Sequence, residues 1–537
     1  MPEIGSTIQN TYRQTANVVR ASFHWYEYAS SEFVSFVSGD SSSVVELVQG
    51  VLLTSAVASL LLFRLGSDIV TVVFPAVLIL YRGFFHPLRK FPGPFGARLS
   101  AFWMSWQLIN KPALEGLQEL HKQYGPIVRV GPSDLSIALP RAVSAVYGPK
   151  SSCTKNSFYD LTAPVRSLHS HRIRAVHDRR KRVWSSAFSD KALRGYEMRI
   201  RVHRQKLFQA LNARANEKIN ISDWFNFYSY DVMGDLALAQ SFNMLETESN
   251  HWILKALIDG IYPLELLLPM WFLRLIMAIP GLAGNYWQFA EFCKQRLMDR
   301  MQREPEIPDI SASLLAPVGQ RVLTTEEMNE LMGDTQLLIT AGSDTTASTL
   351  TTIVYELARM PEEVAKLRAE LAPFEPEVAG EFSHERIAAL PHLNGFINET
   401  LRLHPPIPST IQRKTPLGGI EIDGIYIPGN VTVFCPQYII GRSESAYMSP
   451  ESFIPERWYK YPEMVKEPSA FAPFSIGPYA CIGKSLALMN IRTTIARLIS
   501  SFEIHLSDED KVTFEKSIRE HFSMCIEELN VVLTPRA

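Results

Sequence analysis

Near the C-terminus, residues 474–483 read FSIGPYACIG, and a helical pattern from Lys484 to Phe502 follows at once. A cysteine just before a helix N-terminus gains from the helix dipole and from the free N–H groups there, so the thiolate of Cys481 is favoured. The glycines at 477 and 483 let the backbone approach a flat cofactor and donate N–H groups to sulfur. Cys481 is therefore a candidate metal ligand, although a single cysteine between glycines is more often an ordinary loop residue.

The bulk composition narrows the class of protein. The chain has 537 residues, of which 46% are hydrophobic, and a net charge of −2. A near-neutral balance provides no basic face, so we expect no nucleic-acid partner. Five scattered cysteines without paired spacing argue against a disulfide framework and a Cys-rich zinc site. The cysteines other than Cys481 are expected to be small buried side chains: Cys153, Cys293, Cys435 and Cys525.

The clearest predicted helix begins at Thr324, where Thr324 and Glu327 fit a capping box, and ends near Met360. At 1.5 Å per residue it is about 50 Å long. A helix of this length crosses an entire domain, so something central to the fold is expected to lie against it.

The middle of this helix, residues 341–346, reads AGSDTT. Glycine followed by Asp and Thr is costly inside a helix and can open a local bulge, which frees a carbonyl and a hydroxyl for small ligands such as dioxygen and water. Asp344 would then supply protons that Thr345 passes on. The competing interpretation is a slightly irregular buried helix.

Glu399 and Arg402 lie one turn apart on one face of a predicted helix that ends before Pro405. Such a pair is usually a solvated surface pair that contributes little. Here the helix is half apolar, and the segment 453–458, which contains Arg457, is a plausible docking partner.

The rest of the chain predicts a mainly α fold with small β-sheets. We expect a hairpin over residues 127–138, short strands within 420–434, and late strands at 502–506 and 529–534. Past residue 90 there is no repeat and no convincing linker, so residues 91–537 are predicted to form one domain.

Two apolar runs, 51–63 and 69–81, stand near the N-terminus. We therefore predict an N-terminal extension over 1–43 and a membrane anchor region over 44–90, with one or two hydrophobic segments. The basic residues at 82, 86, 89 and 90 place the remainder in the cytosol by the positive-inside rule. A soluble pair of hydrophobic helices is the alternative. The apolar stretch 261–282 is either core or an exposed patch that dips into the same membrane.

Together these motifs, in this order and spacing, resemble the cytochrome P450 family over nearly the whole chain. The resemblance implies a P450 fold in which Cys481 is the axial ligand of the iron of haem b. Such a ligand pushes electron density to iron and favours O–O cleavage. It also implies that Asp344 and Thr345 form the acid–alcohol pair for proton delivery. Glu399, Arg402 and Arg457 look like the structural triad that supports the haem-binding core.

The loop around Cys481 departs from the family at one position. The family usually has Arg or His two residues before the cysteine to pair a haem propionate, whereas this chain has Tyr479, which brings no charge. Either haem is held less tightly, or other cations pair with the propionate in place of the missing Arg or His. By resemblance the cofactor contacts are Phe474, Gly477, Tyr479, Gly483, Arg413, His177 and Lys181, with Arg182 adjoining them. The run 179–182 is otherwise a solvated helix face or a docking surface for an acidic redox partner.

The resemblance implies a monooxygenase that hydroxylates or epoxidises a lipophilic small molecule with O2. No dinucleotide fingerprint is present, so electrons from NADPH are expected through a separate cytochrome P450 reductase. Residues 81–94, YRGFFHPLRKFPGP, resemble fungal members, many of which tailor secondary metabolites. The expected location is the endoplasmic reticulum membrane, with the catalytic domain facing the cytosol.

Two other functions remain open at this stage: a haem-thiolate isomerase or dehydratase, and a non-catalytic membrane haem-binding protein. Asp344 and Thr345 argue against the first, and Tyr479 slightly favours the second. The substrate pocket is expected to be lined from residues 152–165, 264–276, 338–345, 407–411 and 517–522.

Overall fold

The computed structural model describes residues 75–536 except positions 110, 262, 263, 265, 280, 320, 410 and 527. The predicted extension 1–43 and most of the predicted anchor region 44–90 lie outside these residues. Within the described part, no helix is both long enough and apolar enough to span a bilayer. A compact unit begins at Arg82, nine residues before the predicted domain boundary at 91. Leu88 and Phe91 belong to its core, and the Arg129 N–H donates to the Pro92 carbonyl over 2.7 Å.

The compact unit is mainly helical, as predicted, and α16 (Thr325–Arg359) is its longest α-helix among the described residues. The predicted capping box of Thr324 and Glu327 is present at its N-terminus. The other α-helices are α4 Phe95–Leu99, α5 Phe102–Leu108, α6 Ala113–Tyr124, α7 Ala142–Tyr147, α8 Arg174–Ala187, α9 Asp190–Ala213, α10 Ile221–Leu238, α11 Met244–Thr247, α12 Trp252–Ile261, α13 Met270–Ala278, α14 Gly284–Met301, α15 Ile310–Leu315, α17 Pro361–Leu371, α18 His384–Ile387, α19 Pro391–Leu403, α20 Gln437–Gly441, α21 Lys484–Ser501 and α22 Asp508–Ser517.

The β-structure consists of small sheets, and each predicted strand region is present. A five-stranded sheet has the order β1-β2-β8-β5-β3, in which only β2 and β8 pair in parallel. A three-stranded sheet, β4-β12-β9, and two hairpins, β6-β7 and β10-β11, complete the set. The strands are β1 Ile127–Gly131, β2 Asp134–Ile137, β3 Thr154–Lys155, β4 Lys218–Asn220, β5 Arg413–Lys414, β6 Ile420–Ile422, β7 Ile425–Ile427, β8 Thr432–Phe434, β9 Phe502–Leu506, β10 Arg519–His521, β11 Ser523–Cys525 and β12 Asn530–Pro535.

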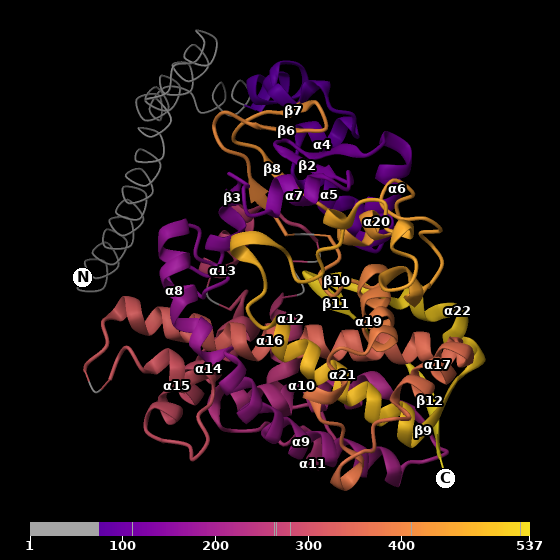
Figure 1. The fold of residues 1–537 in the computed structure, drawn as a ribbon. Coiled ribbons are helices and arrows are strands. Elements are labelled where there is room, and N and C mark those ends of the chain that lie inside the picture. Colours follow the sequence, from indigo (N-terminus) through magenta and orange to yellow (C-terminus); the bar gives the residue numbers. More distant parts are fainter. Residues whose placement is uncertain are drawn as a thin grey trace, which may run out of the picture. The chain divides into compact units, whose positions relative to one another are not determined.

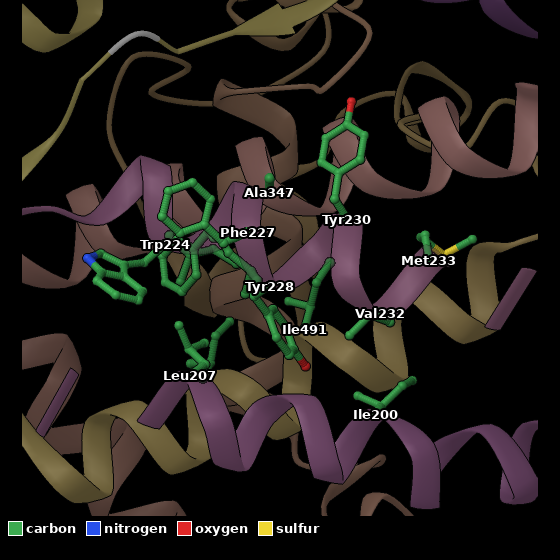
Figure 2. Packing of buried hydrophobic residues seen from close by; sticks show 14 of the residues in the cluster. Ile200, Leu207, Trp224, Phe227, Tyr228, Tyr230, Val232, Met233, Ala347 and Ile491 are labelled. Atoms are coloured by element: carbon green, nitrogen blue, oxygen red, sulfur yellow. The ribbon is translucent and has the colours of Figure 1, made fainter. Parts of the chain in front are cut away.

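The largest core cluster surrounds α10 and α16, which pack against each other. Figure 1 shows the five-stranded sheet near the top of the view and the long helices in the lower half. Nearly every side chain of α10 is buried, including Phe225, Tyr228 and Leu236. α10 is buried on nearly all sides, and residues of α9, α16 and α21 surround it (Figure 2).

The predicted bulge in the middle of the long helix is wrong. α16 is α-helical through residues 341–346, and the Thr345 hydroxyl donates to the Ala341 carbonyl over 2.7 Å. Gly342 has a different role, because a Cβ there would lie 2.6 Å from the Met233 side chain of α10. The glycine leaves room for the Met233 side chain between α10 and α16.

The apolar stretch 261–282 is half-buried to exposed over most of its described residues. Within α13, Leu273 is buried, but Trp271 and Leu275 are 61% and 48% exposed. Both interpretations apply in part: Leu273 is buried and Leu267 packs against a core cluster, whereas Trp271 and Leu275 lie on the surface. The four other cysteines carry no disulfide; three are buried, and Cys525 is half-buried.

Candidate active site

Cys481 lies in the loop between a 3-10 turn, η9 (Gly477–Tyr479), and α21, whose N-cap is Gly483. The Cys481 N–H donates to the Phe474 carbonyl over 2.8 Å, which closes the loop. Gly477 has φ +70°, and a Cβ there would lie 2.5 Å from the Tyr147 carbonyl oxygen. Only glycine satisfies both constraints, so the loop geometry depends on residue 477.

The pKa of the Cys481 thiol is raised, whereas the position of Cys481 before a helix predicted that the thiolate would be favoured. The surrounding protein raises the pKa of the Cys481 thiol by desolvation, although the residue is exposed at the cavity and backbone N–H groups of Gly483 and Lys484 act in the opposite direction, as the helix N-terminus predicts. Desolvation outweighs them in the protein alone. A coordinated metal ion would deprotonate the thiol outright, so this environment suits a metal-bound thiolate better than a free one.

The Cys481 sulfur faces a cavity of about 290 Å³. Ligand pockets usually measure about 300–1,000 Å³, so this cavity lies near the lower end of that range. Most of its lining is apolar, and it is formed by α8, α10, α16, α21 and the Cys481 loop. Its lining includes these residues from segments expected to form the pocket: Lys155, Tyr159, Leu338, Ala341, Gly342, Thr345, Ile407, Ile411 and Phe522. The described residues of the segment 264–276 are not part of it; Leu264 and Leu267 line a small separate cavity.

The acid–alcohol pair sits on the α16 side of this cavity. Thr345 lines the cavity, whereas Asp344 does not. The Asp344 carboxyl instead accepts a hydrogen bond from the Tyr230 hydroxyl of α10 over 2.5 Å. Burial raises the pKa of Asp344 to about 6, and the Tyr230 hydrogen bond acts in the opposite direction. Asp344 can therefore hold or release a proton near neutral pH.

One end of the cavity carries an excess of positive charge around Tyr479. The Lys155 ammonium lies 4.6 Å and the Arg413 guanidinium 5.0 Å from the centre of the Tyr479 ring. Lys155 and Arg413 face each other directly across the β3–β5 pair. Like charges in this position repel each other.

No carboxylate of the described residues neutralises these two cations. Lys155, 3% exposed, donates to the carbonyls of Leu168 and His169, and Arg413 bonds to the Tyr159 hydroxyl and the Gln412 carbonyl. Among the described residues, the Arg413 Nε has no hydrogen-bond partner. Burial, followed by Arg413, holds the pKa of Lys155 well below its usual value. A buried, uncompensated pair of cations fits a ligand that brings anionic groups, as the two propionates of haem do.

The other predicted cofactor contacts either line the cavity or lie outside its lining. Phe474, Tyr479 and Gly483 line the cavity, and so do His177 and Lys181. Lys181 donates to the Pro478 and Ala480 carbonyls, so it supports the Cys481 loop. Burial, followed by Lys155, lowers the pKa of His177 to about 4, so this ring is neutral near pH 7. Arg182 is exposed and is not part of the cavity lining.

Sequence reasoning missed Lys155 as a source of charge at Tyr479. Its local sequence, CTKNSFYD over 153–160, carries no distinguishing pattern. Its position follows from the pairing of β3 with β5, whose residues lie about 260 positions later in the chain.

The structure brings Glu399, Arg402 and Arg457 together as predicted. Arg402 Nε and Nη2 donate to the Glu399 carboxylate over 2.9 and 2.8 Å, and Arg457 Nε donates over 2.9 Å. Glu399 also accepts from the Ile454 N–H and the Trp458 indole. All three charged side chains are fully buried, so the solvated-pair interpretation is wrong. The triad fixes α19 to the segment that leads into the Cys481 loop.

Comparisons with known proteins agree with this geometry. The family model for cytochrome P450 matches residues 92–531. The chain is 58% identical over 460 residues to cytochrome P450 monooxygenase notG' of Aspergillus versicolor, covering 86% of this chain and 85% of that protein. It is 57% identical over 464 residues to tryprostatin B 6-hydroxylase of Aspergillus fumigatus, covering 86% and 83%.

A solved structure, the heme domain of cytochrome P450DA, matches with a TM-score of 0.66 and 17% identity, over 79% of this chain and 93% of that one. At this identity the match shows the fold alone. The relatives carry names of monooxygenases and hydroxylases, so the isomerase and the non-catalytic alternatives lose support. The chain therefore belongs to the cytochrome P450 family and is a haem-thiolate monooxygenase.

Proposed function

We propose that this protein hydroxylates a lipophilic small molecule similar to tryprostatin B. The observation that carries the proposal is the strong likeness to tryprostatin B 6-hydroxylase, together with an apolar cavity wall that could accept such a molecule. Leu337, Leu338, Ile407, Ile411 and Phe522 belong to this wall. The charged lining residues come from β3, α8 and β5, which leaves recognition of the substrate mainly to shape and apolar contact.

We further propose haem b as the cofactor, with Cys481 as its axial ligand. The sequence has no CxxCH motif, which covalent attachment of haem would require. Haem bound through Cys481 supplies the iron centre at which dioxygen is activated. The side chains around it divide the remaining tasks: Lys155 and Arg413 bind the propionates, and the apolar wall excludes water. Asp344 holds the proton that Thr345, with its hydroxyl at the cavity, passes on.

A direct test is to express the full chain with a fungal cytochrome P450 reductase and supply tryprostatin B, NADPH and oxygen. We expect a product heavier by one oxygen atom, formed only when the reductase and NADPH are both present. The reduced protein should show the red-shifted Soret band of thiolate-bound haem with carbon monoxide. A product of unchanged composition, formed without oxygen consumption, would contradict the proposal and favour an isomerase.

We also propose that the chain works at the endoplasmic reticulum membrane with its catalytic unit in the cytosol. Support comes from the apolar runs of the N-terminal sequence and from an exposed apolar patch formed by α5 and α13. The Phe102 ring lies 5.8 Å from the Trp271 ring and 5.3 Å from the Phe272 ring, and Trp106 is 68% exposed. Exposed aromatic clusters of this kind suit a lipid surface. Fractionation of cells that express the full chain should place it in the microsomal pellet; recovery in the soluble fraction would contradict this.

A further inference from the structure

α10 contacts three consecutive residues of α16 immediately before Thr345. The Met233 side chain lies over Gly342, the Ser343 hydroxyl donates to the Ser229 carbonyl over 3.3 Å, and the Tyr230 hydroxyl donates to Asp344 over 2.5 Å. Figure 2 shows Tyr230 and Met233 on α10, with Ala347 of α16 in the same cluster. α10 thus contacts the turn that carries the acid–alcohol pair, and its Ser229 and Met233 line the same cavity as Thr345.

Tyr230 is the only side chain in the described part of the chain that hydrogen-bonds the Asp344 carboxyl. Tyr230 itself is buried, and its ring meets the Phe242 ring edge to face at 6.1 Å. The other titratable groups near it are Cys293 of α14 and Cys525 of β11. No cation of the described residues neutralises Asp344, so the phenol provides its main polar stabilisation.

We propose that Tyr230 is a positioning residue for proton delivery, which holds the Asp344 carboxyl against α10 and keeps it able to exchange a proton next to Thr345. The inference rests on the proposed role of Asp344 and Thr345. Burial, followed by Asp344, raises the pKa of Tyr230 well above its usual value, so the phenol keeps its own proton throughout. Asp344 gives its proton to the Thr345 hydroxyl while that hydroxyl passes its own proton into the cavity, and the resulting carboxylate, which the phenol stabilises, takes up a proton from solvent hydronium.

Replacement of Tyr230 by phenylalanine tests this with the full-length holoenzyme. Without the Tyr230 hydroxyl, the Asp344 carboxylate loses a hydrogen bond. A hydrogen bond to a charged acceptor stabilises that acceptor enough to shift its pKa by about one unit. Infrared titration detects the carbonyl band of a buried protonated carboxyl, and D344N identifies which band belongs to Asp344. We expect the midpoint of this band to rise by about one unit in Y230F.

The matched control is Y228F. Tyr228 is a buried tyrosine on the same helix that leaves it in a different direction (Figure 2) and donates to Asn490 over 2.5 Å. The Y228F substitution should leave the midpoint of the Asp344 infrared titration unchanged. A merely structural role of Tyr230 would give equal midpoints in Y230F and the wild type, which would overturn the inference.

A second measurement separates this inference from the proposed function. In reactions with tryprostatin B, NADPH and reductase, the pH at which product per NADPH falls should move upward in Y230F. The pH at which product per NADPH falls should be the same in D344N and in the double variant with Y230F, because the two residues act as a unit. If D344N leaves the wild-type pH profile and coupling intact, the proposed relay itself is wrong; if only Y230F has no effect, the positioning role is wrong.

Discussion

Replacement of Lys155 by methionine should weaken haem binding while leaving the haem-free protein nearly as stable as before. Lys155 is 3% exposed, faces Arg413 across two paired strands and has only carbonyl acceptors in the described structure. Methionine has a similar length and no charge, so the cavity keeps its shape but loses one of the two cations beside Tyr479.

The size of the effect follows from the bonds involved. A hydrogen bond from a charged donor stabilises by about 1.5–3 kcal/mol, which corresponds to haem binding weakened by roughly 10- to 150-fold. In the haem-free protein, two effects of the substitution on the free energy of unfolding oppose each other. The carbonyls of Leu168 and His169 lose a donor, at a cost of about 1–3 kcal/mol, but the repulsion between Lys155 and Arg413 disappears. The free energy of unfolding of the haem-free form should therefore change by no more than about 1–2 kcal/mol.

Transfer of haem to excess apomyoglobin, followed at the Soret band, measures haem loss, and thermal unfolding of the haem-free protein measures its stability. Lys150→Met is the matched control, because Lys150 is exposed and lies five residues earlier. Wild-type haem retention in K155M would refute the assignment of Lys155 to the propionates. A large loss of stability in the haem-free form would show that the ammonium has a structural role instead.

Three further substitutions test other parts of the site. Glu399→Gln leaves two buried guanidinium groups without an anion and should cost about 3–5 kcal/mol, seen as a lower unfolding temperature, whereas the exposed Glu362→Gln should be neutral. Thr345→Val removes the hydroxyl at the cavity and should lower product per NADPH and raise peroxide release with an unchanged carbon monoxide spectrum; unchanged coupling would exclude Thr345 from the relay. Gly477→Ala forces a Cβ to within 2.5 Å of the Tyr147 carbonyl at φ +70°, so the thiolate Soret band should be lost; its retention would mean that the loop adapts.

The sequence by itself determined the features that depend on short stretches of chain. The Cys481 loop with its glycines, the capping box that begins α16 and the i,i+3 pair of Glu399 and Arg402 all lie within ten residues or fewer. Local hydrogen bonding and helical periodicity govern such features, and both can be read directly from residue spacing.

Tertiary structure alone decided the environment of these groups. The sequence does not reveal that Lys155 faces Arg413, that Tyr230 holds Asp344 from 114 residues away, or that Gly342 accommodates Met233. The sequence left open whether Arg182 contacts the cofactor or lies on a solvated helix face, and the structure places it on the surface. Strand pairing and helix packing set these contacts between distant segments, and the side chains involved carry no local pattern. The chain's own spacing therefore specifies which groups can do the chemistry, while packing specifies which charges and hydrogen bonds surround them.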